Sequence, residues 1–399
     1  MKQRIIQIIA PPDPPFTPMN FTRIPIVQRF WYGGLGAGAP GFLLGFGLWM
    51  WQHGFMIVEG DSYYLLKLWH ARLQIEGFVG AFLLGFALQS GPHITGGKPP
   101  GSQGLLILFH LLWPGLLLSL APDPRVAMLG GVLVSAAYGG AGYALLRVSL
   151  AGNPRLRVPR GLPLTAGITL MAAAPWLELD DPEVALFLLW CGPVTMALVA
   201  AQQLINNVLG GRILQGRMGQ LFVVLLALSW LASGSAAFAG WGSWRMAGAC
   251  WLGTLSVLLV GTDFPRMVWR MGWTAITVTL GSGFAFAFGS GWVMLQRDAL
   301  PDSALHLLAA GMLTTLILGV SARVTGFFSA GAVLPDRVVS YLVILWGVVA
   351  LTRALSPVLP MEEIWTVWMS ILGGLLLLLW GVRTGYRLSQ IRKLLPKNL

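Results

Sequence analysis

Long apolar runs, interrupted by short segments rich in charged residues, Gly and Pro, make up nearly the whole chain. A helix needs about 20 predominantly apolar residues to cross a bilayer, and twelve runs approach this length. We therefore predict an all-α, polytopic integral membrane protein with about twelve transmembrane helices. The predicted spans are 31–52, 64–89, 104–121, 126–146, 162–176, 184–209, 220–240, 246–260, 273–295, 304–324, 338–351 and 364–382.

The charged residues predict how these spans are oriented. If the N-terminus is cytoplasmic, 20 of the 26 Lys and Arg lie on the inner side and 11 of the 15 Asp and Glu lie outside. Cytoplasmic segments of membrane proteins carry an excess of Lys and Arg. We therefore expect a bacterial inner membrane protein with both termini in the cytoplasm. The predicted organisation is a cytoplasmic tail (1–30), a single twelve-helix membrane domain (31–386) and a basic cytoplasmic C-terminal tail (387–399).

Composition excludes several classes of protein. The chain is 56% hydrophobic and only 10% charged, against roughly 25% charged residues in soluble domains. The net charge of +11 follows from membrane orientation, and no nucleic acid partner is expected. Cys191 and Cys250 lie in apolar runs without a C-x-x-C-H motif, which excludes covalently attached haem. The QQLINN sequence at 202–207 is interpreted as interhelical hydrogen-bonding groups, and no internal repeat is evident.

All five histidines lie in or beside apolar spans, where ligating side chains mark functional sites. His70 and His306 both lie on spans that run inward, at similar depths of roughly 6–12 Å below the outer surface at 1.5 Å per residue. Two imidazoles at one level are what a haem b with two axial histidines needs. A mononuclear metal held by these two and His53 is the alternative. His110, nearer mid-membrane, and His93, at the inner face, are weaker candidates.

Other polar residues surround His70 on its span. Gln74 and Gly77 lie on the same helical stripe as His70, and such a stripe could seat the edge of a porphyrin. Arg72 and Glu76 form an i, i+4 pair. The two charges either neutralise one another or serve separate functions. In the second interpretation Arg72 binds a haem propionate and Glu76 handles protons.

Two segments carry a family resemblance. The first begins at Trp69-His70 and continues through a Gly- and Phe-rich span into a Pro-x-x-T-G turn; the second runs from Leu305-His306 to Ala322-Arg323-Val324. The chain resembles the NnrS family of membrane haem-copper proteins linked to the nitric oxide response, whose patterns are W-H-x-H-E and A-H-x-x-x-x-G…TRV. The positions in register in the first segment are Trp69, His70, Gly77, Phe78, Phe86, Pro92, Thr95 and Gly96.

This chain departs from the family pattern at three positions. Arg72 and Leu73 stand where the family has its second His and its Glu, and Phe328 stands where the family has a later His. Because Arg and Phe do not ligate metals, the resemblance favours haem b over copper for this chain.

Two functions remain open at this point. The first is an NnrS-like haem-b-binding membrane protein of the nitric oxide response or of membrane electron transfer, with its haem near the periplasmic face and a periplasmic redox partner or other respiratory subunits. The alternative is a cofactor-free structural or accessory subunit of a respiratory complex. A heme-copper oxidase is excluded, because it needs six ligating histidines including an adjacent pair. A transporter is not favoured, because corresponding broken helices are missing. The sequence assigns no catalytic residue.

Overall fold

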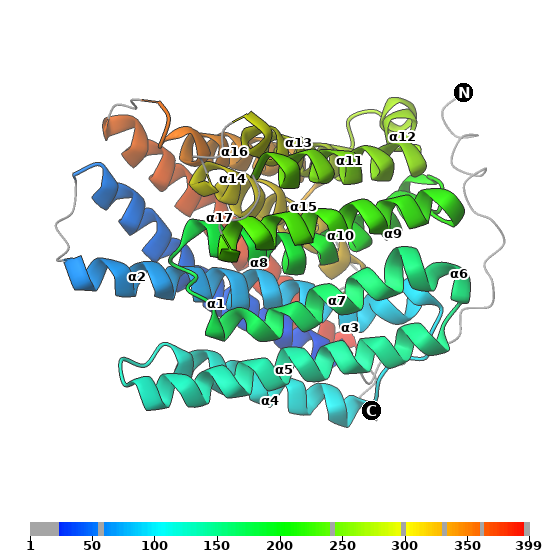
Figure 1. The fold of residues 1–399 in the computed structure, drawn as a ribbon, viewed down its shortest axis with the longest axis horizontal. Helices are drawn as coiled ribbons and strands as arrows, with labels where there is room; N and C mark the ends of the chain where they lie inside the picture. The colour runs from blue at the N-terminus through cyan, green and yellow to red at the C-terminus, as the bar shows by residue number, and fades with distance from the viewer. Residues whose placement is uncertain are drawn as a thin grey trace.

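The structure, a computed structural model, describes residues 24–54, 60–239, 244–296, 301–328, 333–359 and 363–394. Within these ranges the chain forms helices and contains no strand. The long helices lie side by side along the long axis of the molecule, with α4 and α5 at one edge and α11 and α13 at the other (Figure 1). The prediction of an all-α protein is confirmed.

Every predicted span coincides with a helix. In chain order the helices are α1 (Ile24–Gln52), α2 (Gly60–Arg72), η2 (Leu73–Val79), α3 (Gly80–Thr95), α4 (Ser102–Ser119), α5 (Pro124–Ala151), α6 (Pro154–Leu156), η3 (Arg157–Gly161), α7 (Leu162–Leu170), η4 (Met171–Trp176), α8 (Pro182–Leu189), η5 (Trp190–Val194), α9 (Thr195–Leu209), α10 (Gly216–Ala239), α11 (Trp244–Gly261), α12 (Phe264–Met271), α13 (Ala275–Gln296), α14 (Pro301–His306), η6 (Leu307–Thr314), α15 (Thr315–Phe328), α16 (Asp336–Leu355) and α17 (Glu363–Leu394).

Ten helical segments among the described residues are long and apolar enough to cross a membrane. The two predicted spans outside this set are α1 and the pair formed by α7 and the 3₁₀ helix η4, which are helical nonetheless. A multi-pass membrane protein is therefore the class that the fold defines, while the count of twelve and the orientation stay predictions.

The first and last helices extend beyond their predicted spans. Helix α1 begins at Ile24, before residue 31, and α17 continues to Leu394, past residue 386. The division into two cytoplasmic tails and one membrane domain stays a prediction. Residues 1–23 and 395–399 lie outside the described residues.

Three long helical segments share one unusual construction, in which a π-helical segment joins two α-helices. The three units are α2–η2–α3, α8–η5–α9 and α14–η6–α15. A π-helix inserted in an α-helix is rare and is often found at functional sites. His70 lies in the last turn of α2, just before η2, and His306 is the last residue of α14, directly before η6. The histidines thus occupy similar places in two of the three units.

Hydroxyl groups stabilise η2, η5 and η6, the π-helical segments of these three units. A π-turn leaves carbonyl oxygens without their usual α-helical donors, and buried carbonyls need a partner. Tyr138 Oη donates to the Glu76 carbonyl oxygen in η2 at 2.6 Å. Thr195 donates to the carbonyl of Trp190 at 3.0 Å, and Thr314 to that of Ala309 at 2.9 Å. The hydroxyls thus help to support the π-helical turns.

The π-helical units divide the predicted spans into three successive groups of four, and each group contains one unit. The units are the second, sixth and tenth of the twelve predicted spans, and each packs against the helix before it: η2 against α1, η5 against α7, and η6 against α13. The last two helices of each group also pack against one another. The π-helical units therefore recur at every fourth predicted span.

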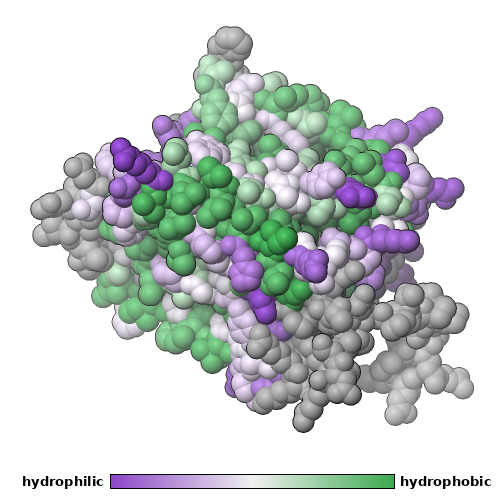
Figure 2. Space-filling model, turned by 90° about the horizontal axis from the view of Figure 1, so that it is seen from below, coloured by the Kyte–Doolittle hydropathy of each residue, from purple (hydrophilic) through white to green (hydrophobic). Residues whose placement is uncertain are grey.

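The exterior is apolar, as lipid contact requires. Figure 2 shows the face that carries α4 and α5, where hydrophobic residues cover much of the surface and smaller hydrophilic areas lie between them and at the sides. These two helices meet through small residues, because a Cβ on Gly130 would lie 2.2 Å from the Ser119 backbone nitrogen. Close backbone approach at Gly is typical of membrane helix pairs. Large exposed apolar residues on this pair are Ile107, Leu117, Met128, Leu129, Val132, Tyr143 and Leu150.

Candidate functional site

His70 and His306 line the same internal cavity. Its volume is about 290 Å³, and its walls come from α1, α2, η2, α8, α14, η6 and α16. This volume is close to the lower end of the range for small-molecule and cofactor sites, roughly 300–1,000 Å³. His70 and His306 were selected by their depth along the predicted spans. Both line one cavity, although they lie far apart in the sequence.

One backbone carbonyl orients the His70 imidazole. His70 Nδ1 lies 2.7 Å from the carbonyl oxygen of Gly41 on α1. A carbonyl oxygen only accepts, so Nδ1 carries the proton and Nε2 keeps a free lone pair. The ring lies against Gly45, where a Cβ would stand 2.5 Å from His70 Cε1. Glycine at position 45 therefore gives the imidazole the room it needs beside α1.

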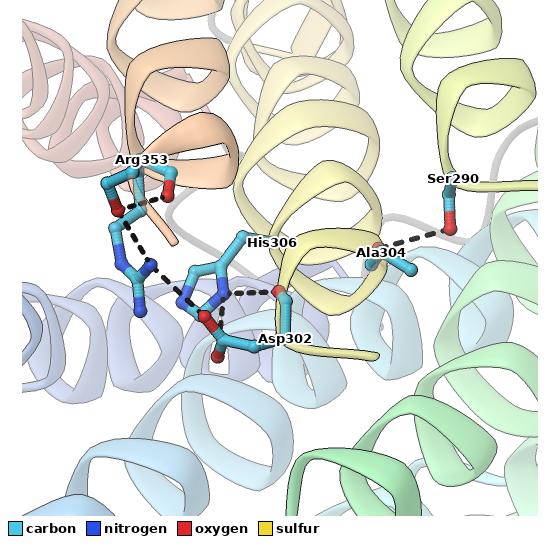
Figure 3. Close-up of polar contacts among 6 residues, drawn as sticks. Ser290, Asp302, Ala304, His306 and Arg353 are labelled. Carbon is cyan, nitrogen blue, oxygen red and sulfur yellow. Dashed lines mark hydrogen bonds and ion pairs between the residues drawn. The ribbon is translucent and has the colours of Figure 1, made fainter. Parts of the chain in front are cut away.

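The His306 imidazole also lies against a backbone carbonyl, that of Asp302 (Figure 3). His306 Nδ1 lies 2.8 Å from the Asp302 carbonyl oxygen and 3.4 Å from the Oδ1 atom of the same residue. The Asp302 carboxylate in turn accepts a hydrogen bond from Arg353 Nη1 at 3.2 Å. Histidines that bind metals through Nε2 commonly donate Nδ1–H to a carbonyl or a carboxylate. Both imidazoles have this arrangement.

The cavity has one polar end and one apolar end. The polar lining residues lie near helix termini on one side of the bundle, whereas aliphatic and aromatic residues line the interior. A cavity of this kind fits an apolar molecule that carries polar groups at one end. At the polar end are Gln52, Tyr63, Lys67, Asp180, Asp302 and Arg353.

Two buried N–H groups at the cavity have no hydrogen-bond partner among the described residues. They are Trp49 Nε1 and Gln74 Nε2, and both side chains line the cavity. A buried donor that is left unsatisfied costs about 1–3 kcal/mol. Unsatisfied donors around a cavity that also offers two free imidazole nitrogens indicate a bound molecule with acceptor atoms.

The other predicted site residues lie elsewhere. His53 does not line the cavity, and no three His, Cys, Asp or Glu side chains within the described ranges gather closely enough to hold a metal ion. Gly77 instead lets η2 pack against α1, since its Cβ would lie 2.6 Å from the Cβ of Ala37. His93 and His110 are exposed and do not line the cavity. The histidine pair with Gln74 is the part of the predicted site that the structure brings together.

Arg72 is directed to backbone carbonyls rather than to the cavity. Its Nη1 donates to the carbonyl of Ser119 at 2.7 Å, and its Nη2 to that of Pro175 at 3.2 Å. Ser119 is the last residue of α4 and Pro175 lies in η4, so Arg72 satisfies carbonyls near two helix ends. This geometry does not favour the interpretation that Arg72 binds a propionate.

Glu76 is fully buried on η2, with 0% exposure. Neither of its carboxyl oxygens has a hydrogen-bond partner in the described part of the chain, and no ion pair joins it to Arg72. Glu76 does not line the cavity. A buried, unpaired carboxyl is unusual, and its role as a proton-handling group stays a prediction.

Sequence reasoning missed the cations at the polar end of the cavity. Lys67 lies one turn before His70 on α2, and Arg353 lies in the last turn of α16. Two features of the sequence could have indicated this polar end. Lys67 lies one helical turn from His70, and Asp302 and His306 form an i, i+4 pair. Only the folded chain shows that α16 carries Arg353 to Asp302.

These features define a polytopic helical membrane protein with a cavity that two imidazoles line. The family model described as NnrS protein matches residues 29–392. The chain therefore belongs to the NnrS family, as the two resembling segments predicted. Comparison with curated proteins gives no match.

Proposed function

We propose that this NnrS-family protein binds haem b between His70 and His306 and acts in the nitric oxide response or in membrane electron transfer. The observation that carries the proposal is the presence of two imidazoles at one cavity, each with Nδ1–H donated to a backbone carbonyl. Each Nε2 is then available as an iron ligand. Iron in haem, once bound, supplies a one-electron redox centre or a binding position for a diatomic gas.

The residues around the histidines fit this cofactor. Phe42 and Trp346 contribute aromatic walls, and Ala309 and Ala310 keep the side near His306 open for a flat ring. Lys67 and Arg353 place positive charge at the polar end, where acidic groups on the edge of a porphyrin would lie. We assign these two residues to the propionates.

The hold on each imidazole determines which chemistry the site performs. Haem held by both His70 and His306 would be suited to electron transfer, whereas haem held by one of them would also be able to bind a gas such as nitric oxide. The Asp302 carbonyl lies on the same helix as His306, whereas Gly41 reaches His70 from another helix. His306 therefore depends less on the packing between helices.

The polar end of the cavity supports a location near one membrane surface. Lys67 is near the start of the segment Ser62–Thr95, and Asp302 is near the start of Pro301–Thr325. In the predicted orientation this surface is periplasmic, so we propose electron exchange with a periplasmic redox partner or with other respiratory subunits in the bacterial inner membrane.

Absorption spectroscopy of the purified full chain tests the proposal. We expect a Soret band, and α and β bands after reduction. His70→Ala and His306→Ala should each remove most of this absorbance, and added imidazole should restore part of it. His110→Ala, which changes an exposed histidine outside the cavity, should leave the spectrum unchanged.

Two outcomes would contradict the proposal. Folded, membrane-inserted protein that stays colourless after incubation with haem would favour the alternative of a cofactor-free structural or accessory subunit. Unchanged spectra in both cavity variants would place the haem elsewhere. Metal analysis of the same preparation tests copper, for which the described residues provide no group of three ligands.

A further inference from the structure

Arg160 is a buried cation at the opposite end of the bundle from the polar end of the histidine cavity. It lies in η3 and is only 2% exposed. The adjacent Gly161 lies near Thr95. Thr95 is the last residue of the segment Ser62–Thr95, which carries Lys67 and His70 in its first half. Burial lowers the pKa of Arg160 to about 10, so the guanidinium is charged at neutral pH.

The charge of Arg160 has no acidic partner among the described residues. Its Nη1 donates to Gln203 Oε1 on α9 at 2.6 Å, which is a neutral contact. Its Nε and Nη2 atoms are buried and have no hydrogen-bond partner. A buried charge without a counter-charge is strongly unfavourable, so this arrangement is incomplete without a bound group.

The two unsatisfied nitrogens define what that group is. Nε–H and one N–H of Nη2 lie on the same edge of a guanidinium and point in parallel directions. This edge binds two oxygens of a carboxylate or a phosphate at once. The contact with Gln203 uses the other terminal nitrogen, so the bidentate edge stays available.

Neighbouring helices add further polar atoms that lack partners. Ser149 on α5 and Thr165 on α7 each have a buried hydroxyl without a hydrogen bond, and both helices pack against η3. A Cβ on Gly161 would lie 2.9 Å from Ser149 Oγ, so this hydroxyl adjoins the chain next to Arg160. Hydroxyl groups can donate to an anion, which the guanidinium alone would leave partly unsolvated.

We infer that Arg160 binds an oxyanion of the phosphate class through its Nε and Nη2 edge, with Gln203 fixing the guanidinium. The exposed Arg155 adds positive charge on the same segment. The anion is either free phosphate or the headgroup of an anionic phospholipid, which basic pockets at the cytoplasmic side of membrane proteins recognise. This inference does not rest on haem binding.

Thermal unfolding of the full chain tests the inference with two probes. In detergent we titrate inorganic phosphate at constant ionic strength, and in nanodiscs we compare phosphatidylcholine alone with phosphatidylcholine plus phosphatidylglycerol. One probe should raise the Tm of the wild type by about 3 °C. A response to phosphate in detergent identifies a free oxyanion, and a response to phosphatidylglycerol alone identifies the lipid.

The variants decide whether Arg160 is responsible. Arg160→Gln should lose the rise in Tm, and Arg155→Gln, an exposed neighbour, should keep it. Arg160→Lys retains a charge but lacks the bidentate edge, so its affinity for the anion should fall about tenfold or more. This variant tests the inference if Arg160→Gln does not fold. A wild type that responds to neither probe, or a rise in Tm in Arg160→Gln or Arg160→Lys equal to that of the wild type, overturns the inference.

Discussion

His70 and His306, which line one cavity, make the same kind of hydrogen bond: each places Nδ1 within 2.8 Å of a backbone carbonyl oxygen, that of Gly41 for His70 and that of Asp302 for His306. A backbone carbonyl cannot rotate away as a side chain can. The imidazoles are therefore held in one tautomer by the helices themselves, with Nε2 free in both.

Gly45→Ala should separate ligand binding from stability. The new Cβ would lie 2.5 Å from His70 Cε1 and 2.9 Å from Nδ1, so the imidazole must move and lose its bond to Gly41. Alanine in a helix is about 1 kcal/mol more favourable than glycine, which offsets the cost of moving a side chain. We expect a Tm close to that of the wild type and a clear loss of Soret absorbance.

Gly36→Ala is the matched control on the same helix, because a Cβ at that position meets nothing within 4 Å. It should leave the spectrum unchanged. Equal spectra in the two variants would show that His70 does not hold the chromophore in the orientation described.

Arg353→Gln should lower stability through Asp302. The variant removes the cation 3.2 Å from the carboxylate and leaves Asp302 partly buried without a charge partner. Because the Asp302 side chain is 34% exposed, solvent reduces the loss to about 1–2 kcal/mol. Tm measurements on the apoprotein check this value.

Haem affinity of Arg353→Gln gives a second reading. If Arg353 binds a propionate, affinity should fall beyond what the loss of stability explains, and Lys67→Gln should lower it as well. Arg125→Gln, an exposed change at the start of α5, serves as the control. Unaltered affinity in both cavity variants would contradict the assignment of these cations.

Arg72→Leu should destabilise the fold and leave the haem spectrum in place. The substitution removes the donors to the Ser119 and Pro175 carbonyls. Two carbonyls without partners cost about 2–4 kcal/mol in total. The measurement is the unfolding midpoint together with the Soret band. A variant of normal stability that lost the haem would instead support a propionate role for Arg72.

The helices and the histidine pair could be predicted from the sequence. Apolar run length indicated the helices, and depth along the spans linked the two histidines. A bilayer allows only helices for such apolar runs, so length and hydropathy were sufficient to predict the helices. His70 and His306 were linked by their depth, because both lie at similar distances from acidic loops along rigid helices. The structure places both on one cavity.

The rest of the site depends on contacts that local sequence does not encode. Gln74 and Gly77 were placed on one face by α-helical spacing, but η2 is π-helical and its wider turn changes which residues share a face. Gln74 lines the cavity whereas Gly77 packs on Ala37. Arg353 reaches Asp302 only because α16 packs against α14.

Glu76 gives the last prediction, since its carboxyl is fully buried and both oxygens lack partners among the described residues. Replacing an unsatisfied buried polar group with an apolar one of similar size is neutral or stabilising. We therefore expect Glu76→Leu to leave the Tm unchanged or to raise it. Tyr138→Phe, which removes the 2.6 Å bond to the Glu76 carbonyl, should instead lower stability by about 1–2 kcal/mol.

Infrared difference spectra between oxidised and reduced protein test whether Glu76 handles protons. A carboxylic acid C=O band that shifts in heavy water and is missing in Glu76→Gln supports that role, because a carboxyl that changes protonation with the redox state must appear in the difference. If the band persists in Glu76→Gln, or if Glu76→Leu transfers electrons at the wild-type rate with the same pH dependence, Glu76 has a packing role only. A strongly lowered Tm in Glu76→Leu would show that its carboxyl has a partner in the folded protein.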